Sequence, residues 1–343
     1  MKTQNYKDEI FLKDPHPILS VRKLAFLLKT NPSKLKQLSE TAGNYYSPFD
    51  RRQARGNGKF KWRHLDSPSN PLKNIQKKIN KLLLRSVVNS LPEGMTGGIS
   101  GRSIFNNAIK HINQEAVATL DLKDCFPKTN NKRIFKVWRN YLKAGNDVSS
   151  ILTRLTTFQR RLPQGSPTSS SLCNIALTPL YKKIENYCHN KNLNLTLYVD
   201  DVTISGKSTA VRSATGGIIN IIQKEGYAVR RNKVEIMTSD KAQKTTGVLV
   251  NKKLSISRKI REKIRMEIIG LAKMETLPSK RLRSLWGKIY HVKQASQKHG
   301  DKLADLANLL LLDKLESKAY QNTTLEKEIT RKCKNTRRHK YGL

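Results

Sequence analysis

An acidic pair between two short apolar runs constrains the fold of this chain most. Apolar residues occupy every second position in residues 193–197 and again in residues 202–205. This alternation predicts two strands, so that Asp200 and Asp201 are expected at the tight turn of a hairpin. Adjacent carboxylates at a rigid turn repel each other unless they meet a cation, and a divalent metal ion is the natural partner. The alternative interpretation is a solvated Asp-Asp turn.

A third carboxylate ends another predicted strand. Residues 116–122 alternate in the same way and reach Asp121 near their end. Magnesium sites favour one or two carboxylates together with substrate phosphates. Three aspartates on adjoining strands would hold two metal ions for in-line displacement at phosphorus. Between these segments, residues 162–170 predict a turn-rich loop that leads into a helix running from residue 168 or 169 to about 188.

The order and spacing of three motifs resemble the palm motifs of a reverse transcriptase. They are Asp121-Leu122-Lys123-Asp124-Cys125-Phe126, Leu162-Pro163-Gln164-Gly165 and Tyr198-Val199-Asp200-Asp201. Two further motifs are similar to signatures of bacterial retron reverse transcriptases: Asn107-Ala108-Ile109-Lys110-His111, and Thr245-Thr246-Gly247 with Thr in place of the usual Val. The resemblance covers roughly residues 15 to 320.

The resemblance implies an α+β, right-hand polymerase fold with fingers, an antiparallel-sheet palm and a helical thumb. We expect N-terminal helices and fingers over residues 1–118 and the palm over residues 119–256, with residues 128–165 partly in the fingers. The thumb is expected over residues 257–325, and a basic tail over residues 326–343. The tail is expected to be disordered until it meets RNA.

The resemblance also assigns site residues. Asp121, Asp200 and Asp201 are the expected catalytic residues and, with the Leu122 carbonyl, the ligands of two Mg²⁺ ions, for which Mn²⁺ is a possible substitute. The residues expected at the nucleotide are Lys61, Arg63, Asp124, Phe126, Gln164 and Gly165. Those expected at RNA or template-primer are Asn107, His111, Tyr198, Thr245, Thr246 and Gly247.

Some of these assignments have plain structural alternatives. Phe126 resembles a steric gate against the 2′-hydroxyl of a ribonucleotide, and it could equally be a core aromatic after a strand. His111 could be a satisfied structural histidine one helical turn from Asn107. The basic and aromatic segment around Lys61 and Arg63 could be a solvated hairpin.

Charge points to a polyanionic partner. The 343 residues include 66 Lys and Arg against 26 Asp and Glu, a formal net charge of +40. Such an excess indicates nucleic acid. A membrane is not expected as a partner, because no stretch approaches the roughly 18 apolar residues of a spanning helix, and no signal peptide is recognised at the N-terminus. Four scattered cysteines predict reduced thiols in a cytoplasmic protein.

The function implied by the resemblance is that of a retron RNA-directed DNA polymerase. Such an enzyme uses deoxynucleoside triphosphates (dNTPs) to copy part of its own non-coding RNA (msr-msd) from the 2′-hydroxyl of a guanosine. Its product is RNA-linked multicopy single-stranded DNA (msDNA), and a nearby effector is expected to act with it in phage defence. The alternatives are a group II intron-like or diversity-generating reverse transcriptase, or a non-catalytic RNA-binding scaffold.

Overall fold

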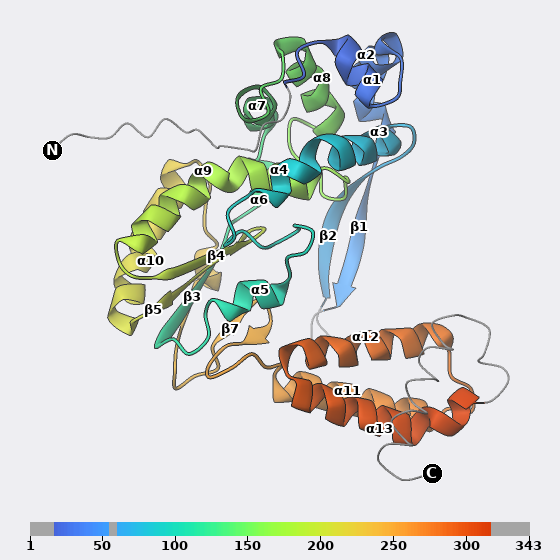
Figure 1. The fold of residues 1–343 in the computed structure, drawn as a ribbon, viewed down its shortest axis with the longest axis vertical. Coiled ribbons are helices and arrows are strands. Elements are labelled where there is room, and N and C mark those ends of the chain that lie inside the picture. Colours follow the sequence, from blue (N-terminus) through green and yellow to red (C-terminus); the bar gives the residue numbers. More distant parts are fainter. Residues whose placement is uncertain (1–16, 55–59, 317–343) are drawn as a thin grey trace. The chain divides into compact units, whose positions relative to one another are not determined.

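The computed structural model describes residues 17–54 and 60–316 (Figure 1). The chain divides into two compact units, Met1–Thr238 and Ser239–Leu343. The boundary lies inside the range 119–256 expected for the palm, and the assignment of fingers, palm, thumb and tail stays a prediction. The expected basic tail, residues 326–343, lies outside the described residues.

A four-stranded antiparallel sheet forms the centre of the first unit. Its strand order is β4-β5-β3-β6, and the strands are β3 (Ala116–Asp121), β4 (Asn194–Tyr198), β5 (Asp201–Gly206) and β6 (Glu235–Thr238). The register pairs Leu120 with Val202 and Asp121 with Asp201. Because side chains alternate between the faces of a strand, one face is apolar and the other carries the carboxylates. The strands predicted from residues 116–122, 193–197 and 202–205 are thus present.

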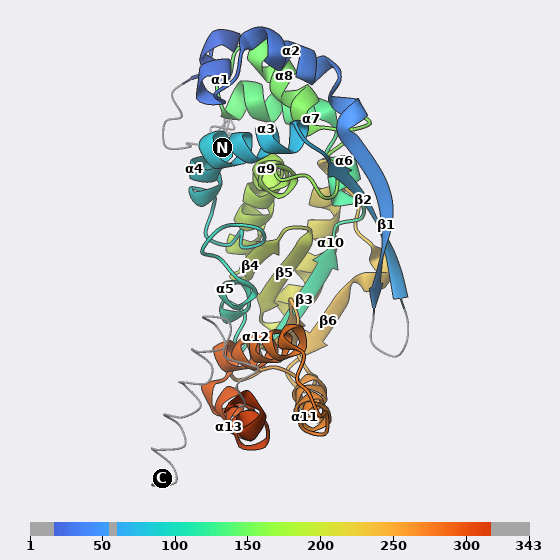
Figure 2. The same ribbon diagram turned by 90° about the vertical axis from the view of Figure 1, so that its right-hand side faces the viewer.

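Two long helices cover the apolar face. They are α9 (Ser169–His189) and α10 (Ser208–Lys224), which pack on the strands (Figures 1 and 2). They contribute Leu172, Ile175, Ile218 and Ile222 to the hydrophobic core. All four of these side chains are fully buried. The helix predicted to start at residue 168 or 169 begins at Ser169.

The remaining elements of the first unit are helices and a separate hairpin. The hairpin pairs β1 (Tyr46–Ala54) with β2 (Phe60–Pro68) in antiparallel register. A nearly continuous rod joins α3 (Leu72–Ile79), the π-helical turn η2 (Asn80–Leu84) and α4 (Arg85–Asn89). The other helices are α1 (Val21–Leu27), α2 (Pro32–Glu40), η1 (Ala42–Tyr45), α5 (Ile104–Ile109), α6 (Cys125–Lys128), α7 (Asn131–Lys136), η3 (Val137–Tyr141), α8 (Asn146–Thr156) and η4 (Arg231–Lys233).

Local capping explains where several of these helices begin. Asn31 accepts a hydrogen bond from the Ser33 N–H at the start of α2, with Pro32 at the first helical position. Ser103 and Asn106 form a reciprocal capping box at the start of α5. These interactions satisfy N–H groups that the first turn of a helix leaves without partners.

The second unit is mainly helical. It contains α11 (Arg258–Ala272), α12 (Ser279–Ala295) and α13 (Gln297–Glu316), whose buried faces include Ile264, Ile268, Leu285 and Ile289. A two-stranded hairpin precedes them, β7 (Lys244–Thr245) with β8 (Val248–Leu249). The sequence suggested strands at 247–250 and 254–256, whereas the turn falls at residues 246–247 and Leu249 bridges to Ser255. Within the described residues, no helix is both long and apolar enough to span a bilayer.

Candidate active site

The hairpin of β4 and β5 carries the acidic pair. Tyr198 pairs with Asp201, so that Val199 and Asp200 alone make the turn. Val199 has a φ of 57°, in the left-handed region that a β-branched residue rarely adopts, and such strain costs about 1–3 kcal/mol. The Leu122 N–H donates a hydrogen bond of 2.8 Å to the carbonyl oxygen of Asp200. The turn is therefore tied to the end of β3.

The third aspartate lies beside this turn. Asp121 is the last residue of β3 and stands opposite Asp201 in the register. Residues that pair across neighbouring strands project from the same face of a sheet. All three aspartates line one cavity of about 940 Å³. The structure thus gathers the residues predicted as catalytic at one end of the sheet.

Burial and mutual repulsion make Asp200 and Asp201 hard to ionise. Burial, followed by the charges of Asp200 and Asp121, raises the pKa of Asp201 to about 6. Burial and the charge of Asp121 likewise raise the pKa of Asp200, against the opposing effect of Lys233. A cation bound among these groups would relieve the repulsion.

Two basic side chains of the chain itself contact Asp121. Lys233 Nζ lies 3.0 Å from Oδ1, and Arg230 Nε lies 3.1 Å from Oδ2. A terminal nitrogen of Arg230 lies 2.9 Å from Oδ1 of Asp124. Among residues 17–54 and 60–316, no group of three or more Asp, Glu, His or Cys side chains has metal-binding geometry. The three aspartates share a cavity, and the carboxylate of Asp121 is directed at these two cations.

The chemistry of the donors fits a divalent metal ion. Oδ2 of Asp121 is buried and receives no well-aligned hydrogen bond from the described residues, although it forms the ion pair of 3.1 Å with Arg230 Nε. Carboxylate oxygens are the ligands that Mg²⁺ and Mn²⁺ prefer. Leu122, predicted to offer its carbonyl, donates its N–H to the Asp200 carbonyl in the hairpin turn, and its side chain is fully buried. The donor types therefore suit a divalent cation.

A strand and a loop form another wall of the cavity. Lys61 and Arg63 line it from β2, and Gln164 and Gly165 line it from the loop before α9. The Asp66 N–H donates a hydrogen bond of 2.7 Å to the Gln164 carbonyl, which joins the strand to the loop. Gly165 has a φ of 123°, and a Cβ there would lie 3.3 Å from the Asp66 carbonyl oxygen. Glycine therefore allows the close approach.

The remaining nucleotide-site predictions also fall on this cavity. Asp124 and Phe126 line it. Phe126 is partly buried and packs against the hydrophobic core as well, so that both interpretations offered for it describe part of its environment. Asp124 has a φ of 52° immediately before α6. The residue that forms the ion pair with Arg230 thus has a left-handed backbone conformation.

The residues predicted to contact RNA lie in three different places. Tyr198 lines the cavity. Asn107 and His111 are fully buried against the sheet, outside the cavity. Thr245 and its two neighbours lie in the second unit at the β7–β8 turn, with Thr245 itself buried. Direct contact of these residues with RNA stays a prediction.

Sequence reasoning missed Arg230 and Lys233. The usable signal was their position just before β6, the strand that pairs with β3. Thr119 pairs with Glu235 in an antiparallel register. Position 233, two residues before Glu235, therefore lies opposite Asp121. A basic residue at position 233 could thus have been placed beside this carboxylate once the pairing was known.

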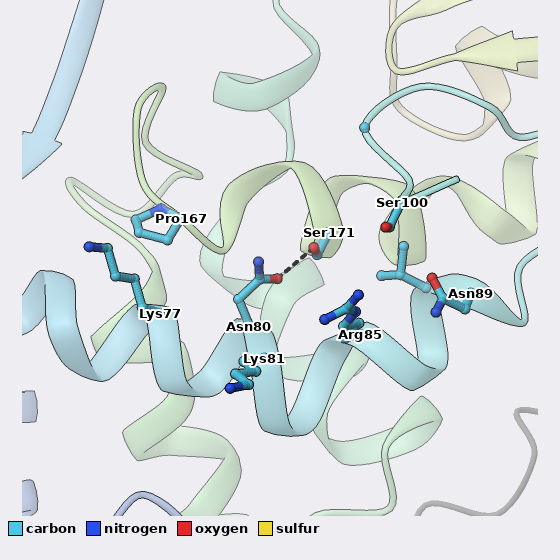
Figure 3. Close-up of a pocket in the computed structure, with 10 residues that line it drawn as sticks. Lys77, Asn80, Lys81, Arg85, Asn89, Ser100, Pro167 and Ser171 are labelled. Atoms are coloured by element: carbon cyan, nitrogen blue, oxygen red, sulfur yellow. Dashed lines mark hydrogen bonds between the residues drawn. The ribbon is translucent and has the colours of Figure 1, made fainter. Parts of the chain in front are cut away.

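A second, basic groove lies beside the start of α9 (Figure 3). Lys77, Lys81 and Arg85 follow one side of the α3–η2–α4 rod and are exposed. Asn80 accepts a hydrogen bond of 2.7 Å from the Ser171 hydroxyl, which fastens the rod to α9 (Figure 3). The groove encloses about 390 Å³, and none of the described residues that line it is acidic. Its chemistry suits a phosphate-rich ligand.

The topology defines the class of the protein. An antiparallel sheet that presents aspartates from its central strand and from a neighbouring hairpin, with helices packed behind it, is typical of a right-hand polymerase fold. Residues 54–250 match the family model described as reverse transcriptase (RNA-dependent DNA polymerase). The chain belongs to the reverse transcriptase family.

Similar proteins are named retron reverse transcriptases. The chain is 31% identical over 264 residues to the retron Mx65 reverse transcriptase of Myxococcus xanthus, covering 71% of this chain and 60% of that protein. It is also 31% identical over 210 residues to the retron Ec86 reverse transcriptase of Escherichia coli, covering 60% of this chain and 64% of that protein. The chain thus spans about three fifths of the length of these relatives. They confirm the resemblance to bacterial retron reverse transcriptases.

Solved structures that align with this chain include a viral reverse transcriptase and a telomerase. A foamy viral protease-reverse transcriptase in complex with double-stranded DNA superposes with a TM-score of 0.47 at 16% identity, covering 91% of this chain and 48% of that chain. Telomerase from Candida albicans superposes with a TM-score of 0.44 at 10% identity, covering 91% of this chain and 70% of that chain.

Proposed function

We propose that this protein is the RNA-directed DNA polymerase of a retron. One observation carries the proposal: Asp121, Asp200 and Asp201 line the same cavity as Lys61 and Arg63. Carboxylates and phosphate-binding cations facing one space are what nucleotidyl transfer from a triphosphate needs. The match to the reverse transcriptase family and the retron relatives supports the same activity.

In this proposal the three aspartates hold two Mg²⁺ ions. When bound, these ions would ease ionisation of the attacking hydroxyl and neutralise the triphosphate and the leaving pyrophosphate. Lys61 and Arg63 bind phosphate oxygens, since ammonium and guanidinium groups pair strongly with them. Gln164, Gly165 and Asp124 complete the nucleotide site. Phe126 lies beneath the sugar, where its ring excludes a 2′-hydroxyl.

RNA is the second partner in the proposal. The formal net charge of +40 provides strong attraction to a polyanion. The groove of Lys77, Lys81 and Arg85 offers three exposed cations on one side of a rigid rod. We assign this groove to the backbone of the RNA strand that is being copied.

The retron-specific part of the proposal rests on the retron relatives. The enzyme primes from the 2′-hydroxyl of a guanosine in its msr-msd RNA and produces RNA-linked msDNA. It acts in the cytoplasm with an effector encoded nearby, in defence against phage. Three buried cysteines, Cys125, Cys173 and Cys188, are free thiols, which fits a reducing compartment.

Primer extension on an RNA template tests the polymerase. With Mg²⁺ and dNTPs, the wild-type protein extends the primer, and Asp200→Asn lowers the rate by at least about 10³-fold while RNA binding is retained. Asp147→Asn is the matched control, because Asp147 is exposed in the first turn of α8, outside the cavity. Near-wild-type extension by Asp200→Asn would refute the assignment.

Sequencing the nucleic acid that co-purifies with the protein tests the retron assignment. A short DNA joined through a 2′ branch to a structured RNA is expected. If cells carrying the gene and its upstream non-coding RNA make no such DNA, the retron assignment fails even where primer extension succeeds.

A further inference from the structure

The retron signature Asn107-Ala108-Ile109-Lys110-His111 faces inward. Asn107, Ala108 and His111 are fully buried, whereas Ile109 is 58% exposed. Asn107 lies in the six-residue helix α5, and His111 follows that helix. The two polar side chains that define the signature are therefore unavailable to a ligand in solvent. Their partners are on the sheet and on the chain segment beside it.

His111 joins the two strands of the catalytic hairpin. Its Nδ1 lies 2.7 Å from the hydroxyl of Ser205, and its Nε2 lies 2.8 Å from the hydroxyl of Thr196. Thr196 precedes Asp200 by four residues, and Ser205 follows Asp201 by four. Burial, and secondarily Lys110, lowers the pKa of His111 to about 3. The neutral ring has one donor and one acceptor, so each hydroxyl can form one hydrogen bond with it.

These hydroxyls project from the face that carries the carboxylates. In the register, Asp201 pairs with Asp121, and Thr203 pairs with Thr196. Because positions along β5 alternate, Asp201, Thr203 and Ser205 share one face. His111 therefore lies on the same side of the sheet as the active-site aspartates, at the opposite end of the hairpin.

Asn107 holds the segment that flanks the hairpin. The Thr96 hydroxyl donates a hydrogen bond of 2.9 Å to Oδ1 of Asn107. The Thr96 N–H donates to the Leu197 carbonyl at 2.9 Å, and the Leu197 N–H donates to the Gly94 carbonyl at 2.8 Å. Residues 94–97 thus run along β4 as far as the turn, and Asn107 fixes them there.

We infer that His111 and Asn107 are positioning residues. They set the register of the β4–β5 hairpin and the position of its Asp200–Asp201 turn relative to Asp121. A polar network in this place specifies one strand pairing, because slipping by one residue would turn Thr196 or Ser205 to the apolar face. The inference rests on the proposed polymerase function for its catalytic consequence. It gives the signature an internal role in place of direct contact with RNA.

The test compares His111→Leu, which removes both hydrogen bonds, with His111→Gln, whose amide keeps one donor and one acceptor. We expect His111→Leu to lower kcat about 10- to 100-fold on a pre-annealed template-primer and to raise the Mg²⁺ concentration for half-maximal rate. Affinity for the RNA stays unchanged, and His111→Gln recovers most of the rate. Thr153→Val is the control, because it removes a buried hydroxyl from α8 that bonds only within that helix.

Amide hydrogen exchange provides a readout that needs no activity. In His111→Leu, exchange should accelerate in residues 194–206 and stay unchanged in residues 146–156, and Thr153→Val should show the reverse. A His111→Leu protein that keeps wild-type kcat and hairpin protection but loses RNA affinity would overturn the inference. If the wild type itself does not polymerise, the proposed function fails, and hydrogen exchange alone then decides whether His111 holds the hairpin.

Discussion

Gly97 lies so close to the turn that carries Asp200 that a single added methyl group should displace this turn and slow the proposed reaction. A Cβ added at this residue would lie 2.3 Å from the backbone nitrogen of Val199 and 2.7 Å from the carbonyl carbon of Tyr198. Both neighbours are backbone atoms, so no side-chain rotation can relieve the clash. Gly97 is itself fixed, because its carbonyl accepts a hydrogen bond of 2.8 Å from the Asn174 amide.

The size of the effect follows from these distances. Ordinary contact begins at 3.4 Å, so Gly97→Ala must displace the turn or residues 94–97 by about 1 Å. Overpacking of this kind typically costs about 1–3 kcal/mol of stability. A misplacement of about 1 Å in a catalytic group can cost about 10²-fold in rate. We therefore expect Gly97→Ala to remain folded and to polymerise about 100-fold more slowly.

Single-turnover primer extension, with thermal denaturation measured in parallel, checks this expectation. Gly216→Ala is the matched control, because a Cβ there meets nothing within 4 Å and α10 should gain about 0.4–1 kcal/mol of stability. A Gly97→Ala protein with wild-type turnover would show that the turn tolerates displacement. The argument from close packing would then be wrong.

Three further outcomes are expected. Phe126→Ala should raise ribonucleotide incorporation relative to deoxynucleotide by roughly 10- to 200-fold in a competition assay, and unchanged sugar selectivity would remove the gate assignment. Replacing Lys77, Lys81 and Arg85 together by Gln should reduce the slope of log affinity for single-stranded RNA against log salt by about 2, measured by filter binding, whereas an unaltered slope would exclude the groove from the RNA path. Because burial lowers the pKa of His111 from 6.5 to about 3, the unfolded state binds the extra proton between these values. The His111 contribution to the free energy of unfolding should therefore be present above pH 6.5 and fall by up to about 1.4 kcal/mol per pH unit below it. When the free energy of unfolding is measured by chemical denaturation, it should fall less steeply with decreasing pH in His111→Gln than in the wild type.

The β4–β5 hairpin could be predicted because its signal is local. Alternation over residues 193–205 determines both the strands and which side chains share a face. The position of Asp121 at the end of a neighbouring strand is read in the same way. Pairing between the two strands was an assumption, and the register of Asp121 with Asp201 confirms it.

Whether the side chains of the Asn107–His111 signature face the core or solvent could not be predicted from the neighbouring sequence. A helix of six residues has too few turns for an apolar stripe to indicate its buried side. Whether His111 faces solvent or the sheet depends on Thr196 and Ser205, which lie about 85 and 94 residues away in sequence. The same holds for Arg230, whose contact with Asp121 exists only once β6 has paired with β3.

The segment that Asn107 holds is also expected to limit self-association. β4 is the outermost strand on its side of the sheet, and residues 94–97 hydrogen-bond along its free edge. An uncovered edge strand offers its backbone groups to other chains and promotes aggregation. Variants that loosen these residues should thus lose monodispersity at high protein concentration, and an engineer seeking a smaller polymerase would need to keep them.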